Sequence, residues 1–129
     1  MVSMIANRSL LGASISRPKA LGIRHRGTCA DHSCHTVVDT QPETGARLVF
    51  LPEFLAGFNG SVDSIGLTPA EQQMRALRAI NQVGRLPYQQ ANCDVLATYA
   101  ETGTAWSPQA VGILALACAA GLVIWASRN

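Results

Sequence analysis

The residues best suited to chemistry cluster in one short stretch, "CADHSCH". Its thiols and imidazoles belong to Cys29, His32, Cys34 and His35. Zinc favours such ligands, but its familiar structural sites take two ligand pairs from separate turns of chain, and no second pair exists here beyond Cys93. We therefore favour an ordinary polar loop. The alternatives are a metal site using these four residues, or a disulfide joining Cys29 to Cys34 or to Cys93.

The known catalytic patterns are missing from the rest of the sequence. It contains no Gly-rich phosphate loop, no GxSxG elbow and no HExxH. A Cys–His pair could be drawn from Cys29 or Cys34, but nothing in that Asp-containing loop would preorganise it. The sequence therefore predicts no catalytic residue, no cofactor and no small-molecule substrate, so we expect a protein that is not an enzyme.

The clearest element is an apolar segment near the C-terminus, "WSPQAVGILALACAAGLVIW", which holds no charged residue. Twenty helical residues span about 30 Å, the thickness of the hydrocarbon core of a bilayer. Ser107 and Pro108 are typical of a helix start, while Trp106, Trp125 and Arg128 suit the two membrane interfaces. We predict a single transmembrane helix within residues 106–129.

The composition of this span indicates how it would be used. It contains no Asp, Glu, His, Lys or Arg that could relay protons, bind an ion or hold a cofactor within the membrane. Small residues allow another helix to approach closely, and we expect partner packing at Gly112, Ala115, Ala119 and Gly121. The span is predicted to be an anchor and a packing surface.

Two short amphipathic helices are predicted in residues 68–105. The first begins with Thr68 as N-cap, followed by Pro69 and by Glu71, which complete a capping box. Its apolar stripe includes Met74 and Leu77, which we assign to partner packing. A second, weaker helix is predicted from about residue 89 to residue 102.

Residues 29–67 are predicted to be irregular apart from a short strand ending at Leu51 and a helical turn beginning at Pro52. This segment holds all three Phe residues of the chain, Phe50, Phe54 and Phe58, spaced by four. Because little protein is available to cover them, we expect them to form an apolar patch that a partner or the interfacial lipid buries, with packing in the chain's own core as the alternative.

The N-terminal 28 residues carry five basic side chains and no acidic one, whereas all eight acidic residues follow. This basic, Ser-containing composition is typical of a mitochondrial presequence, with a plastid transit peptide or a plain basic extension as alternatives. The net charge is only +2. Since basic residues are not concentrated on a folded face with interleaved aromatic residues, nucleic-acid binding is not expected.

These observations predict a mostly α fold without a large independent core, in four parts. They are a basic extension (1–28), an irregular Cys/His- and Phe-containing segment (29–67), two amphipathic helices (68–105) and a transmembrane anchor with a short tail (106–129). Too few large apolar side chains remain outside the span to build a rich core. We therefore expect a chain that depends on partners.

In arrangement the chain is similar to the single-span supernumerary subunits of respiratory complexes and mitochondrial ATP synthase. This resemblance implies a non-catalytic accessory subunit of the mitochondrial inner membrane, bound to other subunits and to lipid. Two alternatives remain open. One is a tail-anchored metal- or redox-binding protein centred on residues 29–35, and the other is a small photosystem-associated subunit of a plastid.

Overall fold

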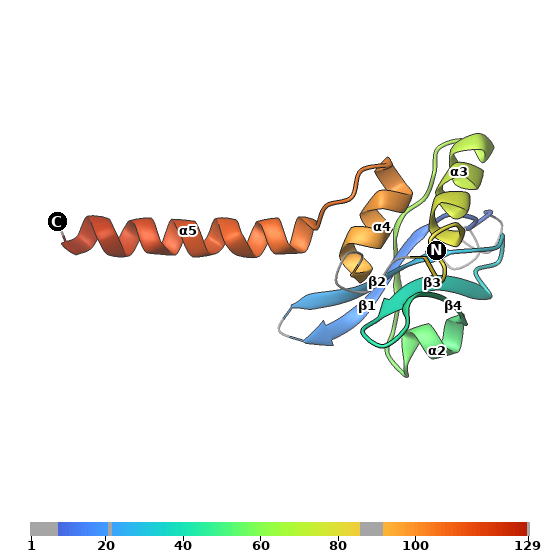
Figure 1. The fold of residues 1–129 in the computed structure, drawn as a ribbon, viewed down its shortest axis with the longest axis horizontal. Helices are drawn as coiled ribbons and strands as arrows, with labels where there is room; N and C mark the ends of the chain where they lie inside the picture. The colour runs from blue at the N-terminus through green and yellow to red at the C-terminus, as the bar shows by residue number, and fades with distance from the viewer. Residues whose placement is uncertain (1–7, 21, 86–91, 129) are drawn as a thin grey trace.

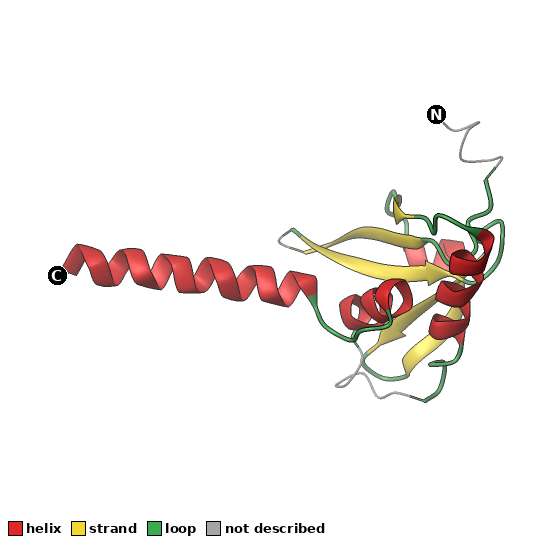
Figure 2. Cartoon of the chain, turned by 90° about the horizontal axis from the view of Figure 1, so that it is seen from above, coloured by secondary structure: helices red, strands yellow, loops and turns green. Residues whose placement is uncertain are grey.

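The computed structural model describes residues 8–20, 22–85 and 92–128. Within these ranges, five strands form one antiparallel sheet in the order β4-β3-β2-β1-β5 (Figures 1 and 2). The strands are β1 (Ser14–Ala20), β2 (Ile23–Cys29), β3 (Thr36–Gln41), β4 (Gly45–Phe50) and β5 (Ser61–Ser64). The sheet therefore begins in the segment that was predicted to be a basic extension.

Helices cover both faces of this sheet. The short helix α2 (Leu51–Leu55) lies on one face, while α3 (Pro69–Ile80) and α4 (Cys93–Thr102) lie on the other (Figure 1). The prediction of a helix capped by Thr68 is confirmed, because the Thr68 hydroxyl accepts from the backbone N–H of Glu71 at 3.1 Å. The second amphipathic helix is confirmed from Cys93 onward, and the earlier part of its predicted range lies outside the described residues.

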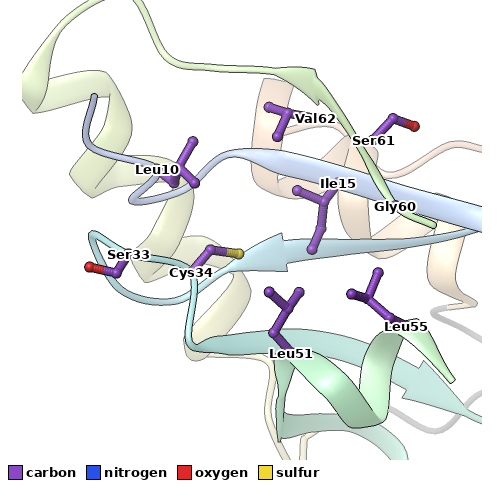
Figure 3. Close-up of a pocket in the computed structure, with 9 residues that line it drawn as sticks. All are labelled: Leu10, Ile15, Ser33, Cys34, Leu51, Leu55, Gly60, Ser61 and Val62. Atoms are coloured by element: carbon purple, nitrogen blue, oxygen red, sulfur yellow. The ribbon is translucent and has the colours of Figure 1, made fainter. Parts of the chain in front are cut away.

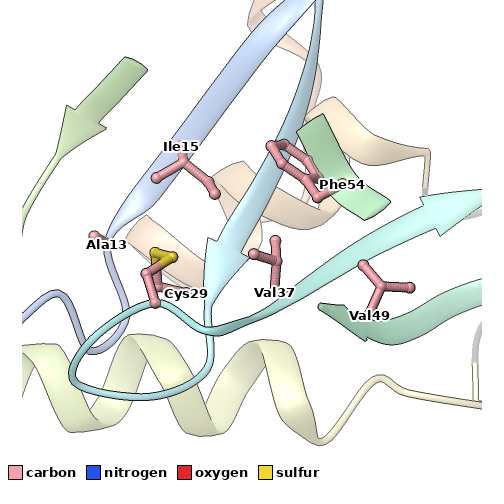
Figure 4. Close-up of a cluster of buried hydrophobic side chains, with 7 residues drawn as sticks. Ala13, Ile15, Cys29, Val37, Val49 and Phe54 are labelled. Carbon is pink, nitrogen blue, oxygen red and sulfur yellow. A yellow bond between two sulfur atoms is a disulfide. The ribbon is translucent and has the colours of Figure 1, made fainter. Parts of the chain in front are cut away.

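Each face of the sheet has its own core cluster. Under α2, the fully buried Phe54 packs with Val37, Val49 and Ile15 (Figure 4). Under α3 and α4, the cluster comprises Val38, Ala46, Ala79, Leu96 and Ala100. Successive residues of β3 thus point to opposite faces, as strand geometry requires.

The predicted mostly α fold without a large core is wrong, and so is the irregular N-terminal region. A core of small side chains makes up for the shortage of large apolar ones, since Ala13, Ser14, Ser16 and Thr28 are all buried in or beside β1 and β2. Because buried Ser and Thr look like loop residues in a sequence, both strands lacked the apolar alternation that reveals a strand.

The C-terminal helix α5 (Pro108–Arg128) extends away from this domain (Figures 1 and 2). None of its residues is buried against the rest of the chain. With 21 residues it is long and apolar enough to cross a bilayer. The chain thus joins a folded α+β domain to one helix with the properties of a membrane span.

Candidate functional site

The site lies where strands β2 and β3 separate. The two strands pair only at Thr28 with Val38 and at Cys29 with Val37. Beyond those pairs they diverge, and His25 of β2 and Asp39 of β3 are buried on the α2 side of the opening. The N-terminus of α4 brings Cys93 to the same place.

A buried histidine there connects a thiol to a carboxylate. The His25 Nε2 atom lies 3.0 Å from Oδ2 of Asp39, and the His25 ring also interacts electrostatically with the Cys93 thiol. The exposed fractions of His25, Asp39 and Cys93 are 3%, 1% and 7%. This order of nucleophile, base and orienting carboxylate is that of a catalytic triad.

Neighbouring residues fix the orientation of His25 and Asp39. Asp39 is the cross-strand partner of Arg47, whose Nε donates to Asp39 Oδ1 at 2.8 Å. The His25 ring stacks on Phe54 with 5.1 Å between centroids. A Cβ at Gly27 would lie only 2.9 Å from the Phe54 ring, so the glycine makes room for that stacking. The base is thus held by a carboxylate and by an aromatic ring.

Cys93 occupies the first position of α4, and Asn92 caps that helix by accepting from the N–H of Val95 at 3.0 Å. Burial of the thiol opposes its ionisation. The hydrogen bond with His25, the backbone N–H of Arg26 and the charges of His25 and Lys19 outweigh burial and lower the pKa of Cys93 below its usual value. The positive end of the helix dipole acts in the same direction.

The imidazole shows the complementary change. Burial disfavours its protonation, but the hydrogen bonds and charges of Asp39 and Cys93 outweigh burial and raise the pKa of His25 above its usual value. A lowered thiol pKa beside a raised imidazole pKa favours the thiolate–imidazolium pair, which is the reactive form of a cysteine nucleophile.

A small cavity of about 100 Å³ opens onto the thiol. Its lining comprises Arg17, Lys19, His25, Thr40, Gln41, Pro42 and Cys93. One water takes up about 30 Å³ in the liquid, so the cavity has room for a group about as large as three waters. A carbonyl group and its immediate substituents are of that size. Two cationic side chains at its edge favour a substrate with an electron-rich or anionic part.

A second, apolar cavity of about 210 Å³ lies between β1, β5 and α2 (Figure 3). Leu10, Ile15, Leu51, Leu55 and Val62 point into it. Its lining includes the hydroxyls of Ser33 and Ser61 but no His, Asp, Glu or Lys that could activate them, so the cavity at Cys93 is the better candidate site.

The four residues considered as metal ligands, Cys29, His32, Cys34 and His35, are not grouped as a metal site in the part of the chain that the structure describes. Cys29 and Cys34 form a disulfide across a separation of five residues, one of the alternatives that the sequence left open. A ring nitrogen of His32 lies 2.6 Å from the hydroxyl of Ser9, and His35 is exposed. With both thiols joined to each other, the cluster offers no thiolate to a metal.

The residues predicted to pack against partners lie in different surroundings. Phe54 is fully buried in the domain's own core, whereas Phe50 and Phe58 are exposed. Met74 and Leu77 are half exposed on α3. The small residues Gly112, Ala115, Ala119 and Gly121 are exposed on α5, as are the interface residues Trp106, Trp125 and Arg128. The three Phe residues therefore do not form one patch.

Sequence reasoning missed His25, Asp39 and Cys93. They lie on three separate elements, and no short motif links them. The one local signal was Asn92 before Cys93, a residue type preferred at helix N-caps, which places a thiol at a helix N-terminus. No protein-family model matches the chain, and no curated protein matches it significantly.

Proposed function

We propose that the protein is a membrane-anchored cysteine acyl hydrolase or acyltransferase. The observation that supports it is the buried imidazole of His25, which is hydrogen-bonded to the Asp39 carboxylate and interacts electrostatically with the Cys93 thiol. Ionisable groups with shifted pKa values that meet beside a cavity are typical of functional sites.

In the first half-reaction, the Cys93 thiolate attacks the carbonyl carbon of an ester, thioester or amide. A C–S bond forms, and the carbonyl oxygen gains negative charge. The N–H groups of Cys93 and Asp94, which come before the capped N–H of Val95 and have no intrahelical acceptor, can donate to that oxygen. The bond to the leaving group then breaks, and imidazolium His25 supplies its proton.

In the second half-reaction, His25 is a neutral base. It removes a proton from water, or from an alcohol or amine acceptor, whose oxygen or nitrogen attacks the thioester carbon. The C–S bond breaks, the acyl group leaves on the acceptor, and the proton held by His25 returns to Cys93. Throughout, Asp39 keeps the ring oriented and stabilises its protonated form.

Activity is testable on the full-length chain in detergent with p-nitrophenyl esters and short acyl thioesters. We expect turnover that Cys93→Ser or His25→Asn lowers by about 10³-fold or more. Cys118→Ser is the matched control, because Cys118 is the other free thiol among the described residues and lies in α5. Turnover that persists in Cys93→Ser would refute the proposal.

The accessory-subunit role remains a second proposal, supported by the exposed apolar surface of α5 with its small residues. Co-purification from native membranes in a stable stoichiometric complex would support it. A single, partner-free species that turns over acyl esters would contradict it. The metal-binding alternative has lost its two thiolates to the disulfide.

A mitochondrial inner-membrane location is likewise only a proposal, based on the basic N-terminal residues. Four of these five side chains, Arg17, Lys19, Arg24 and Arg26, lie on β1 or β2. Cleavage near residue 28 would therefore remove two strands and His25. Imaging a C-terminally tagged chain, together with mapping its mature N-terminus, tests both the location and the cleavage.

A further inference from the structure

The first turn of the anchor helix is tied to the strand that carries His25. The side-chain carboxamide of Gln109 binds both backbone groups of Arg24: its Oε1 accepts from the Arg24 N–H at 2.9 Å, and its Nε2 donates to the Arg24 carbonyl at 3.3 Å. The two residues are 85 positions apart in the chain. Arg24 is the residue immediately before His25.

The Gln109 side chain lies against the edge of β2 beyond the point where β3 stops pairing with that strand. Residues two apart in a strand direct their backbone groups to the same side. Thr28 pairs with β3, the Arg26 N–H meets the sulfur of Cys93, and Arg24 meets Gln109. Along this one edge of β2, the neighbour of the strand is thus first β3, then Cys93 and then Gln109. An amide has one acceptor and two donors, so Gln109 satisfies this edge as the peptide groups of a paired strand would.

Asp94, the residue after Cys93, is also hydrogen-bonded to the start of α5. Its Oδ2 accepts from the Ser107 hydroxyl at 2.6 Å and from the Gln109 N–H at 2.9 Å, while its Oδ1 accepts from Arg26 at 2.7 Å. Asp94 is 4% exposed and directly follows Cys93. The start of the anchor is therefore hydrogen-bonded to the residues adjoining both His25 and Cys93.

We propose that Gln109 is a positioning residue, through which the membrane anchor holds the His25 strand against Cys93. The anchor is then part of the catalytic machinery, not only a tether. This inference rests on the proposed function, which it deepens by linking the geometry of the thiol and the imidazole to the first turn of α5.

The test compares wild type with Gln109→Ala, Gln109→Glu and the matched control Gln73→Ala, which lies on the exposed surface of α3. Full-length chains in lipid nanodiscs are alkylated with iodoacetamide over a range of pH, and the modification of Cys93 is followed by mass spectrometry. Turnover of a p-nitrophenyl ester is measured on the same samples.

We expect Gln109→Ala to move the alkylation midpoint to higher pH and to lower kcat by about 10- to 100-fold, with a smaller change in KM. Gln109→Glu keeps the acceptor for the Arg24 N–H but loses the donor, so its effect should be smaller. Gln73→Ala should match wild type. Both readouts report on the site and not only on whether the domain is folded.

A Gln109→Ala chain that remains folded, with the alkylation profile and kcat of wild type, would overturn the inference. If that variant does not fold, the same wild-type behaviour in Gln109→Glu would overturn it. A different result would refute the proposed function. If no ester turnover depends on Cys93 but the alkylation midpoint still moves in Gln109→Ala, the positioning role stands and acyl transfer does not.

Discussion

At the scale of single residues, the proposed function depends on how Asp39 is held. It is buried, it orients His25, and it receives two hydrogen bonds from Arg47, at 2.8 and 3.3 Å. A buried carboxylate needs such donors because removing it from water is costly. The same ion pair therefore stabilises the sheet between β3 and β4 and fixes the orientation of the base.

Asp39→Asn should remove the charge that stabilises imidazolium His25 while keeping the shape of the side chain. We expect kcat to fall by about 10²-fold or more and the free energy of unfolding to fall by about 1–3 kcal/mol. The matched control is Asp63→Asn on the exposed strand β5. Ester turnover and urea unfolding provide the measurements, and an Asp39→Asn chain with wild-type kcat would exclude the triad.

Thr40, beside Asp39, provides a second prediction at this scale. Its buried hydroxyl has no hydrogen-bond partner among the described residues. Thr40→Val should therefore raise the stability by about 1 kcal/mol, since it removes an unsatisfied polar group at nearly constant volume. Thr98 is equally buried but accepts from Arg26 at 2.9 Å, so Thr98→Val should lower the stability instead. Thermal unfolding of both variants would show opposite shifts, and equal shifts would contradict this reasoning.

At the scale of elements, the loop between β2 and β3 keeps the two strands paired just before they separate. The Cys29–Cys34 disulfide closes it, and the Asp31 carboxylate within it accepts from three backbone N–H groups and from the Thr36 hydroxyl. Partial burial of this carboxyl opposes ionisation, but these hydrogen bonds outweigh burial and lower the pKa of Asp31 to about 2.

Stability should therefore depend on pH through Asp31. Its pKa in the folded state is below the unfolded value of about 3.9, so its contribution is fully present above about pH 4 and is lost as the pH falls toward 2. Asp31→Asn should lower the urea midpoint at pH 7 and flatten its decline between pH 4 and pH 2.5. A decline as steep as that of wild type would show that other carboxylates cause it.

The sequence predicts the elements that depend on local signals and misses those that depend on long-range contacts. The helix α3 follows from a local signal, the cap at Thr68, and α5 follows from its length and apolar composition. The strands β1 and β2 do not, because their buried faces use Ser14, Ser16 and Thr28, and because Arg26 is satisfied by Asp94, Thr98 and Glu101 from α4. These contacts are long-range, and so are those that bring His25, Asp39 and Cys93 together.

At the scale of the whole molecule, the disulfide and the span together predict an orientation. Disulfides form and persist in oxidising compartments, so we expect the domain to face such a compartment. Arg128 then lies on the opposite side of the membrane, in agreement with the positive-inside tendency. A membrane-impermeant protease added to intact cells or vesicles from that oxidising side should digest the domain. Full protection of the domain would reverse this orientation.

In the proposed function, Cys93 is an acyl-accepting nucleophile activated by His25. The most direct measurement is peptide mass spectrometry of the full-length chain quenched during turnover of a p-nitrophenyl ester. We predict an acyl thioester on Cys93 that forms during the burst of p-nitrophenol and decays in water, and that does not accumulate in His25→Asn. Acylation that is absent from Cys93, or that proceeds equally fast without His25, would contradict the account.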